Sequence, residues 1–177
     1  IACNNLGNVL KDLGQLNAAV KCYEQALAIK PDFAEVHNNL GITLKNLGQL
    51  NAAVKSYEKA IAIKPDHEDA HNNLGNVLKD LGQLDAAVKC YEQALAIKPD
   101  FAEAHNNLGI SLQELGQLDE AVKSFEKAIA IKPDYAEAHK NLGNVLKDHK
   151  RKDEALISFE RALALNPGVN FLLGDIL

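Results

Sequence analysis

The 177-residue chain contains no methionine, no tryptophan and only three cysteines, Cys3, Cys22 and Cys90. An odd number of cysteines without close spacing argues against a disulfide framework. We therefore expect free, half-buried thiols in a reducing compartment and a cytoplasmic location. A natural reading frame begins with methionine, so its absence indicates an excised or processed piece of a longer protein.

Long apolar runs and long basic runs are also missing. No stretch approaches the roughly 18 apolar residues of a membrane span, and 19 Lys and Arg against 24 Asp and Glu give a net charge of −5. Membrane insertion is therefore not expected, and nucleic acid is a poor candidate partner. No G-x-S-x-G, H-E-x-x-H, phosphate loop or C-x-x-C occurs. We therefore predict no catalytic residue, no metal ligand and no cofactor.

A fixed period dominates what is present. All five prolines and two columns of glycine recur every 34 residues: Pro31, Pro65, Pro99, Pro133 and Pro167; Gly7, Gly41, Gly75, Gly109 and Gly143; Gly14, Gly48, Gly82 and Gly116. A period of about 20 to 50 residues is typical of a solenoid, in which neighbouring repeats bury a common core. We expect five repeats within residues 1–169, near 1–33, 34–67, 68–101, 102–135 and 136–169, followed by an apolar extension at 170–177.

Each repeat is predicted to form two helices. In the third repeat, apolar residues recur at helical spacing up to Leu81, and Gly82 is expected to end the first helix. The second helix buries Ala87, Tyr91 and Ala94, and small residues such as Gly75 should let the two helices approach closely. Asp85 is predicted to cap this second helix. The D-x-x-E spacing at the junctions predicts capping boxes for the first helices: Asp32 with Glu35, Asp100 with Glu103, and Asp134 with Glu137.

The fifth repeat departs from this pattern, because His149, Lys150, Arg151 and Lys152 replace Leu-Gly-Gln-Leu. Lys150 stands in the second glycine column and is therefore expected to be left-handed, at a cost of about 1 kcal/mol. Either this is a solvated turn near one end, or it contacts a following domain.

A helix–turn–helix of 34 residues with Leu-Gly, two spaced alanines, an aromatic residue and a terminal proline resembles the tetratricopeptide repeat (TPR). The resemblance covers residues 1–169. It implies an all-α, right-handed superhelical solenoid of about five repeats and ten helices, plus a short C-terminal segment. It also implies that the first helix of each repeat lines the concave side.

A narrower resemblance lies in the wording NNLGNVLK, followed later by CYEQALAIKPDFAEAHNNLG. It is similar to the repeat arm of O-linked N-acetylglucosamine transferases and their bacterial relatives. In that subgroup an asparagine column lines the groove and holds extended peptide.

Asparagines form the candidate binding site. One column is Asn5, Asn39, Asn73, Asn107 and Asn141, accompanied by Asn4, Asn38, Asn72 and Asn106, with neighbours Asn76, Lys79 and Asp80. An amide offers one acceptor and two donors, which match the N–H and C=O of a peptide unit. The alternative is that these asparagines form hydrogen bonds between repeats or are relics of duplication.

Histidines form a further column, His37, His71, His105 and His139. One repeat should advance by about 10 Å, the usual distance between packed helices. Histidines so far apart cannot ligate one metal ion at about 2.0–2.1 Å. A packing role is therefore expected, with pH sensing or metal binding as the alternative.

Three functions remain open: a non-catalytic scaffold that binds extended polypeptide in its concave groove, the substrate-recruiting arm of a glycosyltransferase, or a scaffold that self-associates through exposed ends. Terminal repeats expose one side unless they are capped. The C-terminal residues are apolar: Phe171, Leu172, Leu173, Ile176 and Leu177.

Overall fold

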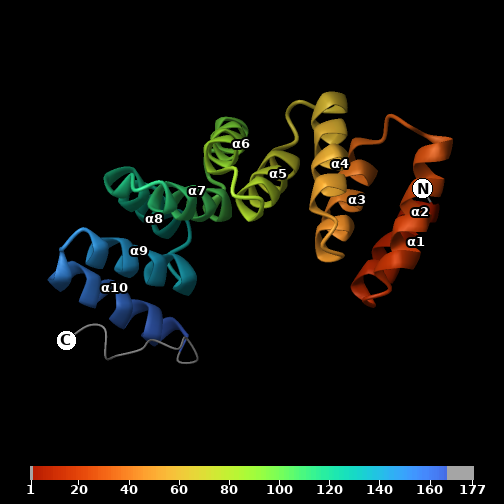
Figure 1. The fold of residues 1–177 in the computed structure, drawn as a ribbon. Helices are drawn as coiled ribbons and strands as arrows, with labels where there is room; N and C mark the ends of the chain where they lie inside the picture. Colours follow the sequence, from red (N-terminus) through yellow and green to blue (C-terminus); the bar gives the residue numbers. More distant parts are fainter. Residues whose placement is uncertain (1, 167–177) are drawn as a thin grey trace. The chain divides into compact units, whose positions relative to one another are not determined.

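Ten α-helices and no strands occur between residues 2 and 166, which are the residues described by this computed structural model (Figure 1). The predicted all-α class is therefore confirmed, whereas the extension at 170–177 lies outside the described residues. The helices are α1 (Ala2–Asp12), α2 (Leu16–Ile29), α3 (Ala34–Asn46), α4 (Leu50–Ile63), α5 (Glu68–Asp80), α6 (Leu84–Ile97), α7 (Ala102–Glu114), α8 (Leu118–Ile131), α9 (Ala136–Asp148) and α10 (Lys152–Leu165).

Two compact units, Ile1–Ile97 and Lys98–Leu177, divide the chain. In the first unit α1 packs on α2, α3 on α4 and α5 on α6; in the second, α7 packs on α8 and α9 on α10. Within each unit the second helix of one repeat also packs on the first helix of the next, as α2 does on α3 and α8 on α9. Each unit is therefore built from stacked helical hairpins.

The turn inside each hairpin depends on one left-handed residue. Gly82 has φ +74°, and its N–H donates to the Lys79 carbonyl at 2.8 Å while the Gln83 N–H donates to the Leu78 carbonyl at 2.8 Å. These bonds satisfy carbonyls at the end of α5. Lys150 adopts φ 63° at the equivalent position, so the expected left-handed lysine is confirmed.

The predicted caps are wrong. The first helices begin at Ala34, Ala102 and Ala136, their N-cap residues are Phe33, Phe101 and Tyr135, and none has a side-chain cap hydrogen bond. The Lys30, Lys98 and Lys132 ammonium groups lie 5.0, 5.1 and 5.0 Å from the centroids of these three rings. The aromatic residue takes the cap position, and the preceding Asp32, Asp100 or Asp134 is left in the turn.

Asp85 is not a cap either, because α6 already begins at Leu84. Asp85 lies in the first turn of α6 and Glu35 in the first turn of α3. Both carboxylates therefore act on the helix dipole and not as side-chain caps.

An aromatic ring on a glycine joins the two helices of every repeat. A Cβ built on Gly75 would lie 2.6 Å from Cε1 of Tyr91, closer than real Cβ contacts come. The corresponding distances are 2.6 Å for Gly7 to Tyr23 and Gly41 to Tyr57, 2.7 Å for Gly109 to Phe125, and 2.5 Å for Gly143 to Phe159. All five rings are buried, so the predicted packing of small residues against a large one is confirmed.

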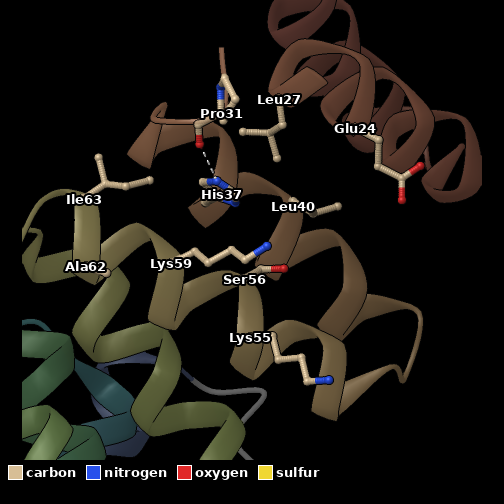
Figure 2. Close-up of a pocket in the computed structure, with 10 residues that line it drawn as sticks. All are labelled: Glu24, Leu27, Pro31, His37, Leu40, Lys55, Ser56, Lys59, Ala62 and Ile63. Atoms are coloured by element: carbon tan, nitrogen blue, oxygen red, sulfur yellow. Dashed lines mark hydrogen bonds between the residues drawn. The ribbon is translucent and has the colours of Figure 1, made fainter. Parts of the chain in front are cut away.

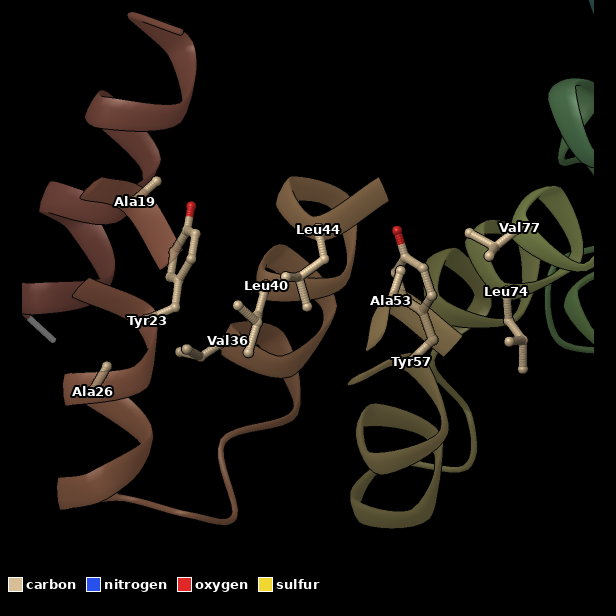
Figure 3. Close-up of a cluster of buried hydrophobic side chains, with 10 residues drawn as sticks. All are labelled: Ala19, Tyr23, Ala26, Val36, Leu40, Leu44, Ala53, Tyr57, Leu74 and Val77. Atoms are coloured by element: carbon tan, nitrogen blue, oxygen red, sulfur yellow. The ribbon is translucent and has the colours of Figure 1, made fainter. Parts of the chain in front are cut away.

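The same rings connect one repeat to the next. Ala19, Tyr23 and Ala26 of α2 belong to one buried cluster with Val36, Leu40 and Leu44 of α3 (Figure 3). In Figure 3 the side chain of Tyr57 lies between its own helix α4 and the Leu74–Val77 side of α5. One ring thus fills the hairpin and contributes to the interface beyond it.

Gly75→Ala should destabilise the chain by about 1–3 kcal/mol, because the methyl group overlaps a buried ring with no free space beside it. In a Tyr91→Leu background the same substitution should be neutral or stabilising by up to about 1 kcal/mol, because alanine is the better helix former. Urea unfolding of the four chains of this double-mutant cycle measures both values. Equal effects of Gly75→Ala in the two backgrounds would contradict the ring–glycine contact.

Candidate functional site

Adjacent asparagines on each first helix have different surroundings. Neighbouring side chains point about 100° apart on a helix, so Asn38 of α3 is buried whereas Asn39 is half-buried. The same division holds for the other pairs: Asn4, Asn72 and Asn106 are buried; Asn73, Asn107 and Asn141 are half-buried; Asn5 is exposed. The nine predicted asparagines therefore form an inner and an outer column.

Hydrogen bonds connect the two columns across neighbouring repeats. Nδ2 of Asn73 donates to Oδ1 of Asn38 at 3.1 Å, and Nδ2 of Asn141 donates to Oδ1 of Asn106 at 3.0 Å. Nδ2 of Asn39 donates to Oδ1 of Asn4 at 3.5 Å and of Asn8 at 3.2 Å. We call this series the asparagine ladder. The inter-repeat bonds weighed as the alternative role of the column therefore exist.

The ladder uses the donor side of each outer amide and leaves the acceptor side. Each primary amide carries two N–H donors and a carbonyl oxygen. Among residues 2–166, the oxygens of Asn39, Asn73 and Asn141 accept no hydrogen bond. The ladder also fixes these side chains, so their oxygens are held in place before any partner arrives.

Lys79 and Asp80 form ion pairs at the C-terminal end of α5. Lys45 Nζ lies 3.3 Å and Lys79 Nζ 3.8 Å from the Asp80 carboxylate. In the second unit, Nε2 of Gln113 donates to Oδ2 of Asp148 at 2.8 Å. These groups are partly exposed, and such pairs contribute little to stability. They remain accessible to a partner bound on the same face.

Histidines bind the loop between repeats. Nε2 of His37, His71, His105 and His139 lies 2.9, 2.9, 2.9 and 3.0 Å from the carbonyl oxygens of Pro31, Pro65, Pro99 and Pro133. A carbonyl only accepts, so each Nε2 carries the proton. Burial lowers the pKa of His105, which favours the neutral ring. Among residues 2–166 no group of three potential ligands could hold a metal ion.

Sequence reasoning missed a hollow on the side of the second helices. It has a volume of about 590 Å³ and is lined by Glu24 and Leu27 of α2, Pro31, His37 and Leu40 of α3, and Lys55, Ser56, Lys59, Ala62 and Ile63 of α4 (Figure 2). A second hollow of about 400 Å³ is lined by the equivalent residues of α8, α9 and α10, including Ile129, His139, Leu142 and Arg161. The signal was in the sequence, because Leu27, Leu40 and Lys59 recur at the 34-residue step.

The thiols are free. Burial raises the pKa of Cys90 to about 11, which keeps it a protonated, weakly nucleophilic thiol. No helix among the described residues is long and apolar enough to span a membrane.

Comparison with known families matches nearly the whole described chain. The TPR repeat profile matches residues 7–48, 43–82 and 75–116, and a second tetratricopeptide repeat profile matches residues 100–167. The chain belongs to the tetratricopeptide repeat family. A comparison with curated proteins found no match.

Solved TPR structures share the fold. MamA is 27% identical with a TM-score of 0.84, covering 91% of this chain and 94% of MamA. YrrB, described as a TPR protein with an unusual peptide-binding site, is 25% identical with a TM-score of 0.78, covering 96% of this chain and 87% of YrrB. A thermophilic TPR protein of Thermus thermophilus is 26% identical with a TM-score of 0.74, covering 95% of this chain and 92% of that protein. The chain is therefore a protein-interaction scaffold of the TPR type.

Tyrosine hydroxyls extend the polar network of this TPR chain, with one exception. Tyr23 donates to Oδ1 of Asn8 at 2.7 Å, and Tyr91 donates to Oδ1 of Asn76 at 2.9 Å. Tyr57 is equally buried, but Ile42 stands at the place of Asn8 and Asn76. Among the residues described, the Tyr57 hydroxyl has no hydrogen-bond partner. Burial raises the pKa of Tyr57 and raises that of Tyr23 to about 12.

Removing the Tyr57 hydroxyl should therefore stabilise the chain, by about 1 kcal/mol, because a buried unpaired hydroxyl carries a desolvation cost. The matched variants Tyr23→Phe and Tyr91→Phe should instead destabilise it by about 1 kcal/mol, because each breaks a hydrogen bond. The three free energies of unfolding in urea provide the comparison. Equal losses for all three would show that Tyr57 has a partner in solution.

Proposed function

We propose that the chain is a non-catalytic scaffold that binds extended polypeptide along its first helices, in the concave groove that the family resemblance implies. The observation that carries this proposal is the set of half-buried amides whose donors are engaged in the ladder and whose oxygens are not: Asn39, Asn73 and Asn141. Three free thiols fit a reducing compartment, and we propose the cytoplasm.

The oxygens would accept hydrogen bonds from peptide N–H groups. Successive repeats should advance by about 10 Å, and an extended peptide rises about 3.3 Å per residue. Every third peptide residue would therefore meet one outer asparagine. Because each neutral hydrogen bond contributes about 0.5–1.5 kcal/mol, affinity should come from several bonds together.

Bonds to the main chain do not distinguish sequences, so selectivity would fall to side chains near the ladder. Asn76, Lys79 and Asp80 lie on α5, where the Lys45–Asp80 and Lys79–Asp80 pairs place both charges on one surface. The equivalent of Asn76 is the half-buried Ile110 in the fourth repeat. A bound segment would therefore meet mixed charge at the third repeat and an apolar contact at the fourth.

Similarity to YrrB adds support of a general kind, because that protein is described as having a peptide-binding site. The present chain has two kinds of surface that could serve: the asparagine ladder and the hollows on the side of the second helices. We favour the ladder because its polar atoms match a peptide main chain, whereas the walls of the hollows carry flexible charged side chains.

Replacing Asn39, Asn73 and Asn141 together by alanine should weaken the binding of an unstructured peptide pool by about 10-fold or more, which is the loss of two to three neutral hydrogen bonds. Fluorescence anisotropy measures the affinity, and circular dichroism confirms that the variant is folded.

Two controls separate binding from stability. Asn38→Ala with Asn106→Ala breaks the ladder from the buried side but leaves the outer amides, so it should reduce stability and change affinity much less. Lys59→Ala alters the hollow between α2 and α4 and should leave affinity unchanged. The proposal fails if the folded triple variant keeps its affinity, or if affinity follows Lys59.

A substrate-recruiting arm of a glycosyltransferase is the second candidate function. It is favoured by the wording NNLGNVLK and CYEQALAIKPDFAEAHNNLG, which is similar to the repeat arm of O-linked N-acetylglucosamine transferases. The two candidates share the same groove and differ in whether a catalytic region follows in the parent protein. The parent gene sequence distinguishes them.

The chain itself should turn over no sugar nucleotide under either candidate function. Within residues 2–166 its carboxylates lie in turns and on helix faces, and they do not surround a pocket that positions a donor and a general base. A coupled assay of nucleotide release from a sugar nucleotide, with an acceptor peptide present, measures this. Release above the buffer control that depends on the folded chain would contradict the non-catalytic proposal.

A further inference from the structure

The first helix exposes a face that is buried in later repeats of the same unit. Leu6, Val9 and Leu13 of α1 are 53%, 54% and 67% exposed. Their equivalents Leu40 and Leu74 are each 8% exposed, and Thr43 and Val77 are fully buried. The later residues are covered because the second helix of the preceding repeat packs on them, α2 on α3 and α4 on α5.

A hollow continues this exposed face. It has a volume of about 460 Å³ and is lined by Ala2 and Cys3 of α1, Ala26 and Ile29 of α2, and Lys30 and Phe33. Ile29 is 81% exposed, whereas its equivalent Ile63 is 39% exposed. At the place of Cys3, the next two repeats have His37 and His71, which bind the proline carbonyl of the preceding loop. The hollow thus lies where a preceding repeat would place its loop.

The last described helix exposes the matching half of this interface. Leu156 and Leu163 of α10 are 43% and 41% exposed. Their equivalents Val20 and Leu27 of α2 are half-buried and packed against the α2–α3 cluster. Phe159 lies between them in sequence, at the place of Tyr23, whose ring packs with Val36 and Leu40.

One chain therefore carries both halves of an interface that recurs inside it. We propose that copies of the chain associate head to tail, the exposed face of α1 in one copy packing on the exposed face of α10 in another. The occupant is a second copy because that copy presents the same residue types, in the same order, that cover α3 and α5 internally. This inference is independent of peptide binding at the ladder.

The interface is heterologous, because it joins two different surfaces. Such contacts either close into rings or grow into open filaments. The weight-average mass should therefore rise with concentration beyond that of a dimer. An isologous pairing of two α1 faces would stop at the dimer.

Two variants that each block one surface give a decisive test. Leu6→Glu with Leu13→Glu blocks the α1 face, and Leu156→Glu with Leu163→Glu blocks the α10 face; all four positions are exposed, so folding should persist. Sedimentation velocity should show each variant alone as a monomer. An equimolar mixture should form a one-to-one dimer and nothing larger, because each partner supplies the surface that the other lacks. Lys89→Glu on the exposed side of α6 is the matched control and should associate like the unaltered chain.

Circular dichroism confirms the fold of each variant. A monomeric unaltered chain up to the highest soluble concentration would overturn the proposal. Self-association of the α10-blocked variant would also overturn it in favour of α1–α1 pairing. A mixture of folded variants that remains monomeric would show that the two faces do not bind each other.

Discussion

The contact of an aromatic ring with a helical glycine is the constraint on which the rest of the structure depends. It recurs in all five repeats, from Gly7 with Tyr23 to Gly143 with Phe159. The missing Cβ lets the ring lie against the backbone of the first helix, which sets the spacing of the hairpin. The opposite side of the same ring faces the next repeat, as Tyr23 faces Val36 and Leu40. Local and inter-repeat packing are therefore one interaction, and a change to it should affect both.

This packing determines what the asparagines can do. Because it aligns successive first helices, Nδ2 of Asn73 reaches Oδ1 of Asn38 and Nδ2 of Asn141 reaches Oδ1 of Asn106. A buried polar side chain is costly unless it is hydrogen-bonded, and the outer amides supply bonds to the inner ones. In return, each outer amide is fixed with its oxygen directed elsewhere. Structural and binding roles, first weighed as alternatives, are then two ends of one side chain.

The repeating features could be predicted from the sequence because they repeat. Glycine, alanine and aromatic columns locate the helices and their close approach, and the glycine column predicts the left-handed Lys150. The caps could not be predicted, because Asp32 and Glu35 match a capping box while the Phe33 ring, beneath Lys30, takes the cap position. The ladder was weighed only as an alternative, because amide partners 35 residues apart depend on how repeats stack. The unpaired Tyr57 hydroxyl follows from Ile42 in the asparagine place, a local difference visible only once the contact is known.

The central functional claim is that the outer asparagine oxygens bind a peptide main chain. The most direct measurement is an NMR titration of the chain, with labelled asparagine side-chain amides, by an unstructured peptide. The proposal predicts that the Asn39, Asn73 and Asn141 amide signals shift in proportion to occupancy, while those of the buried Asn38 and Asn106 shift less and residues around the α2–α4 hollow do not shift. Shifts confined to Lys59, Leu27 and their neighbours, with unchanged outer asparagine signals, would contradict it.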